Sequence, residues 1–184
     1  SPRFGAAQQV HPSGRRLSAQ YIAFPSAEGS GTGRGYLVRP TRARRALPVV
    51  LVVHENRGLN PHIEDIARRL ALANFIAFAP DALFPLGGYP GNEDDARALF
   101  AKLDQGKTRQ DFIAAARMLR SIEGGNGRLG TVGFCYGGGM ANFLATQLPD
   151  LDAAAPFYGS AAPLEDVAKI KAELLVVLAA SDER

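Results

Sequence analysis

Residues 129–139 join an apolar, strand-like run to the chain's single cysteine and to a cluster of glycines. The pattern Gly133-x-Cys135-x-Gly137 is typical of a nucleophile elbow, a strained strand-to-helix turn that exposes a reactive side chain. Glycines are needed two residues before and after the nucleophile because strand and helix crowd any Cβ there. A helix expected over residues 140–148 would direct its N-terminus at the sulfur and favour a thiolate. The alternative is a small buried hydrophobe, but the strand-turn-helix context favours catalysis.

Length and composition bound the remaining possibilities. The 184 residues suit one domain, and 46% apolar with 21% charged residues are ordinary globular values. A single cysteine excludes an internal disulfide, and no apolar run reaches a membrane span or a signal-peptide core. We therefore expect a soluble, cytoplasmic protein that uses no membrane. Because the chain opens at Ser1, removal of an N-terminal export signal is the alternative for its location.

The net charge of +3 comes from basic residues that are mostly scattered. One cluster is an exception, and we interpret it as a solvated loop between two strands. It consists of Arg39, Arg42, Arg44 and Arg45. No aromatic residues alternate with these arginines, so a nucleic-acid partner is not expected.

Strand-like and helix-like segments alternate along the chain, which predicts an α/β fold with a doubly wound, mostly parallel sheet. Residues 1–19 are expected to be an irregular arm, and residues 20–184 the domain. The predicted strands are 21–24 and 35–39, paired as an antiparallel N-terminal hairpin, followed by 47–54, 75–79, 129–134, 153–159 and 174–179. The predicted helices are 63–71, 93–103 with Asn92 as N-cap, one that begins at Thr108, and 140–148. Residues 82–92 are expected to be a long irregular loop.

Polar residues follow four of the predicted strands, and active groups gather beyond the carboxyl ends of such strands. They are His54 with Glu55, then Asp81, Cys135 and Asp182. Asp182 is the candidate acid of a triad, since the order nucleophile, acid, histidine is one of those that triads follow along the chain. Its alternative interpretation is an exposed turn aspartate.

The base of such a triad has no candidate downstream of Asp182. His11, His54 and His62 all precede Cys135. We expect His54, at its strand end, to support the neighbouring loop rather than to act as a base. A site without an imidazole would lose general-base activation, which typically contributes ~10²- to 10⁴-fold.

Taken together, the Gly-Phe-Cys-Tyr-Gly-Gly-Gly elbow, the segment 54–58, Pro80-Asp81 and the strand end at Asp182 resemble the dienelactone hydrolase family, from about residue 20 to the last residue. The resemblance implies an α/β-hydrolase fold and hydrolysis of the lactone of carboxymethylenebutenolide (dienelactone) to maleylacetate, as in bacterial breakdown of chloroaromatic compounds. It implies no metal and no organic cofactor. The family's last strand and helix, which carry the histidine, are expected beyond residue 184.

The resemblance also implies residue roles. Cys135 would be the nucleophile, Asp182 the acid, and Glu55 the carboxylate that turns toward the thiol when substrate binds and takes its proton. The alternative for Glu55 is an ion pair with Arg57 in its loop, and both can hold in different states. The backbone N–H groups of Tyr136 and Asn56 would form the oxyanion hole.

Residues 82–85 lack the arginine with which the family's pattern holds a substrate carboxylate. Leu83, Phe84 and Tyr89 instead predict an apolar substrate pocket. We therefore expect hydrolysis of a small ester or lactone through a thioacyl intermediate, by a monomer or small homo-oligomer. Two alternatives stay open: a catalytically silent protein of the same fold used for binding or sensing, and a hydrolase acting on peptides or acyl carriers.

Overall fold

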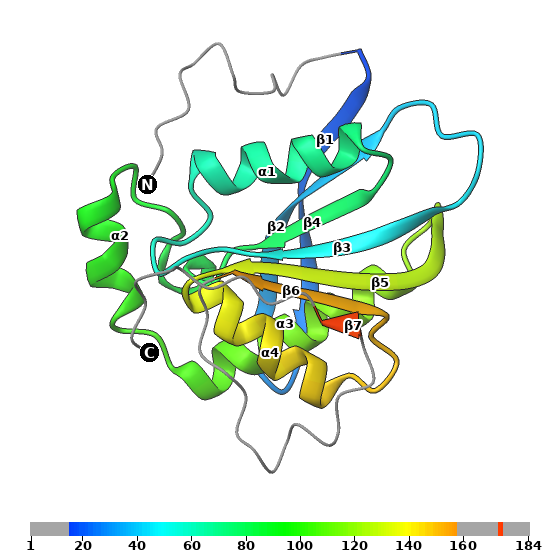
Figure 1. The fold of residues 1–184 in the computed structure, drawn as a ribbon. Coiled ribbons are helices and arrows are strands. Elements are labelled where there is room, and N and C mark those ends of the chain that lie inside the picture. Colours follow the sequence, from blue (N-terminus) through cyan, green and yellow to red (C-terminus); the bar gives the residue numbers. More distant parts are fainter. Residues whose placement is uncertain (1–14, 158–172, 175–184) are drawn as a thin grey trace.

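The computed structural model of the protein describes residues 15–157 and 173–174, which form one mixed sheet with helices on both faces (Figure 1). The strand order is β1-β2-β4-β3-β5-β6-β7. The strands are β1 (Leu17–Ser26), β2 (Gly31–Pro40), β3 (Leu47–Val53), β4 (Ile76–Pro80), β5 (Gly125–Phe134), β6 (Ala153–Phe157) and β7 (Glu173–Leu174). Only the β1–β2 and β2–β4 pairs in this part of the chain are antiparallel. The predicted doubly wound, mostly parallel sheet with an N-terminal hairpin is confirmed.

The hairpin is longer than the sequence predicted. β1 and β2 pair residue for residue from Leu17 with Pro40 to Ser26 with Gly31. Residues 17–19 therefore belong to a strand, and their assignment to an irregular arm was wrong. The strand was hard to recognise because β1 lies at the edge of the sheet and most of its side chains are exposed or half-buried.

Two apolar layers cover the central strand β3. On one face, Val52 packs in a cluster with residues of helix α1 (Pro61–Leu72). On the other face, Leu51 and Val53 share a cluster with residues of α3 (Gln105–Arg120) and α4 (Tyr136–Gln147). Figure 1 shows α1 on one side of the sheet and α3 with α4 on the other. Burial on both faces explains why β3 is a continuous apolar run in the sequence.

Three helices begin at a side chain that accepts a hydrogen bond from the backbone N–H three residues later. Asn60 caps α1 and Asn92 caps α2 (Glu93–Phe100), the latter as predicted. The N-cap of α3 is Asp104, which accepts from the N–H of Lys107 at 3.1 Å, so the prediction of Thr108 was wrong. Thr108 lies in the first turn and donates to the carbonyl of Asp104. The glycine of this first turn lowers its helix propensity and concealed the true start.

The segment after β4 is irregular, as predicted, except for one 3₁₀ turn over Phe84–Leu86. Proline in its first turn presets the backbone, and Gly87 ends it at a φ of 103°. Of the two last predicted strands, residues 153–157 and 173–174 are strand. The remainder of both predictions, including Asp182, lies outside the described residues. Among helices in the described ranges, none is long and apolar enough to cross a membrane.

A buried carboxylate ties the hairpin to α3. Asp111 accepts hydrogen bonds from the hydroxyls of Ser26 and Ser30, both at 2.6 Å, and from the N–H of Ser30 at 2.8 Å. A Cβ on Gly29 would lie 2.2 Å from this carboxylate, so the turn approaches the helix closely. Three accepted hydrogen bonds compensate for burying the charge and fix the hairpin on the α3 face.

Candidate active site

Glu55 and Cys135 follow two neighbouring strands at the same edge of the sheet. β3 and β5 are parallel, and Val53 pairs with Gly133 at their ends. Glu55 and Cys135 each lie two residues beyond that pair. Paired strands are about 4.8 Å apart, so the register brings the two loops together. The chain moves from β3 to β4 on one side and reaches β5 on the other, so this is the switch point of the sheet, where ligands bind in such folds.

Cys135 has the strained geometry expected of an elbow. Its φ of 54° and ψ of −111° place it in a region that residues other than glycine rarely adopt. Its backbone N–H donates to the carbonyl of Phe157 at 2.7 Å, and its own carbonyl accepts from Gly138 and Gly139 in the first turn of α4. The residue is exposed. Strand, turn and helix thus hold the thiol in the open, and such strain is typical of functional sites.

The two glycines of the motif are required by backbone contacts. A Cβ on Gly133 would lie 1.8 Å from the carbonyl oxygen of Gly137. A Cβ on Gly137 would lie 2.2 Å from the carbonyl oxygen of Val53 and 2.7 Å from that of His54. Real Cβ atoms do not approach backbone so closely, so only glycine fits. The same contacts press the first turn of α4 against the end of β3.

The candidate oxyanion donors occupy backbone turns at the two strand ends. Tyr136 is the first residue of α4, and its hydroxyl donates to Gln105 at 3.0 Å. Its ring meets the edge of Phe100 with centroids 4.6 Å apart. Burial raises the pKa of Tyr136, opposed by the nearby charge of Arg109, so the phenol stays protonated and remains a donor. Asn56, the other candidate, lies in the exposed turn after Glu55.

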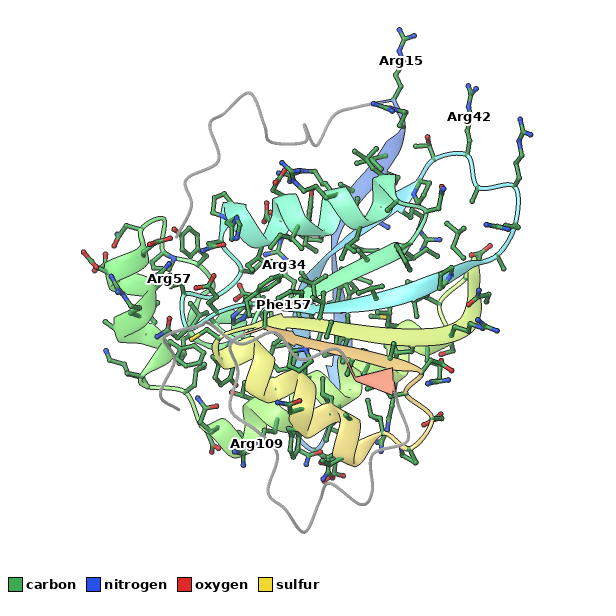
Figure 2. The ribbon with its side chains drawn as sticks, viewed as in Figure 1. Arg15, Arg34, Arg42, Arg57, Arg109 and Phe157 are labelled. Carbon is green, nitrogen blue, oxygen red and sulfur yellow. The ribbon has the colours of Figure 1, made fainter. Side chains whose placement is uncertain are left out.

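Arg57 joins two carboxylates beside this turn. Its Nη1 is 3.8 Å from Oε2 of Glu55 and 3.5 Å from Oε2 of Glu93 in α2. Figure 2 shows Arg57 between the end of β3 and α2. The predicted ion pair of Glu55 within its own loop is therefore present in this structure. The sequence reasoning did not predict Glu93 as the second partner, because 36 positions separate it from Arg57 and no local pattern links them.

His54 supports the loops, as expected. The side chain is fully buried, its Nδ1 lies 2.6 Å from the carbonyl of Glu55, and its Nε2 accepts from the N–H of Ala82 at 3.0 Å. Both ring nitrogens are thus engaged with backbone, which assigns the proton to Nδ1 and leaves neither nitrogen for Cys135. Burial lowers the pKa of His54, and the charge of Asp81 opposes that shift only in part. The ring is held neutral.

Asp81 fastens the two loops to each other. Its Oδ1 accepts from the N–H of Leu83 at 3.0 Å and from that of Leu59 at 3.5 Å. The bond two residues ahead is an Asx-turn, so the sequence Pro-Asp after a strand was a usable signal for it. The bond to Leu59 was not predictable from sequence, since it joins loops that follow different strands.

The three predicted pocket residues do not behave alike. Leu83 has no exposed surface, and it packs where a Cβ on Gly58 would lie only 2.5 Å away. It packs against the Gly58 turn, and its place in a substrate pocket stays a prediction. Phe84 and Tyr89 are half-buried. Burial raises the pKa of Tyr89, and the neighbouring carboxylate of Glu93 adds to the shift.

A cavity of about 450 Å³ lies at the opposite end of the central strands, lined in part by Arg39, Arg44 and Arg45. This end holds the first residue of β3, Leu47, whereas Cys135 follows the last residue of β5. Arg15 and Arg42 project from the same end of the molecule (Figure 2). Arg42, Arg44 and Arg45 lie in an exposed loop, as predicted, and this loop is remote from the elbow, whereas Arg39 is half-buried in β2.

The sheet order, together with an elbow at its switch point, defines an α/β-hydrolase fold. A solved structure named "m3DLH" superposes with a TM-score of 0.76 at 27% identity, covering 91% of this chain and 71% of that one. Residues 34–184 match the pattern of the Dienelactone hydrolase family. The chain belongs to the dienelactone hydrolase family.

Two curated relatives show how similar the chain is to known proteins. The "Putative hydrolase fragment YghX" of Escherichia coli K12 is 52% identical over 103 residues, which are 56% of this chain and 88% of the relative. The "Putative carboxymethylenebutenolidase" of Salmonella typhi is 35% identical over 158 residues, covering 84% of this chain. The chain spans 57% of the length of that Salmonella protein.

Proposed function

We propose that the protein hydrolyses small carboxylic esters or lactones through a thioacyl intermediate on Cys135. The observation that carries this proposal is the exposed sulfur-bearing residue at φ 54°, between two glycines that close backbone contacts demand. A cysteine that served only as packing would be buried and would need no strained backbone. Membership of a hydrolase family supports the same conclusion.

The first half-reaction would use groups at the ends of β3 and β5. The Cys135 thiolate attacks the acyl carbon and forms a C–S bond while the carbonyl oxygen takes up the negative charge. The N–H groups of Tyr136 and Asn56 would stabilise that oxyanion. Collapse breaks the C–O bond, and the alkoxide leaves with the proton that the thiol gave up. In a lactone, the leaving oxygen stays attached to the acyl chain.

Glu55 is proposed as the group that takes the thiol proton. In this structure its carboxylate pairs with Arg57 at 3.8 Å, a distance long enough for a weak, exchangeable contact. Rotation away from Arg57 would bring it toward the neighbouring strand end, where Cys135 lies. Thiolate formation would then be linked to an occupied site, which supports selectivity for esters over other electrophiles.

The second half-reaction requires activation of water to attack the thioester. We propose that the general base is a histidine oriented by Asp182. His54 is not a candidate, since backbone groups engage both of its nitrogens. Attack by water breaks the C–S bond and returns the thiol and a free carboxylic acid.

The substrate class follows from the loop after β4 and from the relatives. Half-buried Phe84 and Tyr89 favour an apolar acyl group over an anionic one. The name carboxymethylenebutenolidase, which belongs to the Salmonella relative, supports a lactone or enol ester. A role in degrading aromatic compounds would fit such a substrate.

The test compares full-length wild type with Cys135→Ala and Cys135→Ser on p-nitrophenyl acetate and on a small uncharged lactone. We expect the alanine variant to lose hydrolysis and the wild type to gain the mass of one acyl group on Cys135. Equal hydrolysis by wild type and Cys135→Ala would overturn the proposal. Absence of acylation in wild type would favour a binding or sensing role instead.

A further inference from the structure

Helix α2 stands apart from the two helical layers, beside the ends of β3 and β5 (Figure 1). Within α2, Ala96 is the residue that is fully buried, whereas the acidic first turn is exposed. A helix with so little buried surface gains little from core packing. Its position must therefore depend on a few specific side-chain contacts.

Two of those contacts lie at the opposite ends of the helix. At the first residue, Glu93 Oε2 is 3.5 Å from Arg57 Nη1. At the last residue, the Phe100 ring meets the Tyr136 ring edge-on, with centroids 4.6 Å apart and planes at 79°. With a rise of 1.5 Å per residue, an eight-residue helix holds these contacts roughly 10 Å apart.

Each contact reaches a segment that carries a candidate oxyanion donor. Arg57 directly follows Asn56 in the turn after β3, and Tyr136 itself bears the other N–H. The two segments follow the paired strands β3 and β5, and Gly137 packs on the carbonyl of Val53, so the strand ends themselves are held together. The turn at Asn56 continues beyond these contacts, and α2 provides a second link between it and Tyr136. Oxyanion donors act only when held within about 0.5 Å of the productive geometry.

We propose that α2 is a positioning element that sets the separation between the N–H groups of Asn56 and Tyr136, with Glu93 and Phe100 as positioning residues. This inference rests on the proposed function for its catalytic consequence, though not for the mechanical link. The helix acts as a rigid link of fixed length between the two turns. Loosening either end removes this second link, so the turn at Asn56 and the turn at Tyr136 gain freedom relative to each other.

The plainer interpretation is that α2 merely covers the surface above Ala96. The two interpretations predict different effects on the turn at Asn56, which is distant from Phe100. If α2 only covers the surface, loss of the Phe100 ring should disturb the elbow alone. If α2 links the two turns rigidly, loss of the same ring should also loosen the turn at Asn56.

The experiment uses full-length wild type, Phe100→Ala, Glu93→Gln, and the conservative variants Phe100→Tyr and Glu93→Asp. Arg97→Gln is the matched control, because Arg97 is exposed on α2 and pairs with Asp94 of the same helix. Amide hydrogen exchange is followed in peptides spanning residues 55–59 and 135–139. We expect exchange to rise about 10-fold in both peptides for Phe100→Ala and for Glu93→Gln, and to stay near wild type in the conservative variants and the control.

The catalytic readout is the single-turnover acylation of Cys135 by p-nitrophenyl acetate, set against its alkylation by iodoacetamide. Acylation passes through an oxyanion and alkylation does not. We expect about 10-fold slower maximal acylation in both disruptive variants, with half-saturating ester concentration and alkylation rate within about twofold of wild type. Glu93→Gln leaves packing intact, so it decides the matter if Phe100→Ala fails to fold.

The outcomes separate the two proposals. Wild-type protein that alkylates but never acylates overturns the proposed function, while the exchange data still decide whether α2 links the two turns. Acylation in wild type with unchanged acylation in both variants overturns the positioning role. Exchange that rises only in the peptide next to each substitution overturns the rigid link.

Discussion

Gly137 meets the end of β3 so closely that a Cβ on it would lie 2.2 Å from the carbonyl oxygen of Val53. This contact joins the first turn of the elbow helix to the neighbouring strand. It places the nucleophile's loop next to the end of β3, from which the Glu55 loop continues. The arrangement of the site therefore depends on the absence of a Cβ at residue 137.

Replacing Gly137 with alanine should lower the free energy of unfolding by about 1–3 kcal/mol, the usual cost of overpacking. The reason is that backbone, rather than a flexible side chain, must move. Urea denaturation measures the change. Gly106→Ala is the control, since its Cβ would meet only the side chain of Asp104 at 3.3 Å. That variant should stay within about 1 kcal/mol of wild type, and an equal loss in both would contradict the argument.

Stability should fall as pH falls below about 6.5, because burial lowers the pKa of His54. A lowered pKa means that the unfolded chain binds the proton more readily than the folded one, so acid favours unfolding. Between about pH 7.5 and about pH 5 the slope for one proton is at most roughly 1.4 kcal/mol per pH unit.

Urea titrations across this pH range measure that dependence. His54→Gln should be less stable at neutral pH and should lose much of the slope, while His62→Gln should keep it. An unchanged slope in His54→Gln would show that another group is responsible.

Asp111→Ala should destabilise the fold by about 2–3 kcal/mol, since hydrogen bonds to a charged group are worth about 1.5–3 kcal/mol and Ser26 would be left buried without its acceptor. Thermal and urea unfolding measure the effect. Asp94→Asn is the comparison, because Asp94 is 90% exposed in its pair with Arg97 and exposed pairs contribute little. Similar losses in the two variants would argue against the role of Asp111 in holding the hairpin against α3.

Glu55→Gln should slow acylation of Cys135 by about 10²-fold near neutral pH, the scale of general-base contributions. The deficit should shrink at higher pH, where hydroxide supplies the thiolate. Alkylation by iodoacetamide should change little, because Glu55 pairs with Arg57 when no substrate is bound. Stopped-flow release of p-nitrophenol gives the acylation rate, with exposed Glu28→Gln as control. An acylation rate equal to wild type would remove Glu55 from the mechanism.

Local sequence patterns predicted much of the fold. The apolar run of β3, the N-cap at Asn92 and the glycine spacing around Cys135 are each set by residues within one turn or one strand, so the sequence predicted them. Prediction failed where the local signal was weak. We predicted the N-cap of α3 at Thr108 instead of Asp104, and we predicted residues 17–19 of the edge strand to be irregular.

What the sequence determined by itself is the identity of the elbow and the alternation of strands with helices, because both arise from contacts between near neighbours. Only the tertiary structure decided how the loops meet. The register of β3 with β5 pairs Val53 with Gly133, two residues before Glu55 and Cys135, and Arg57 reaches Glu93 across 36 positions of chain. Such contacts depend on the path of the whole backbone, and no local pattern of residues encodes that path.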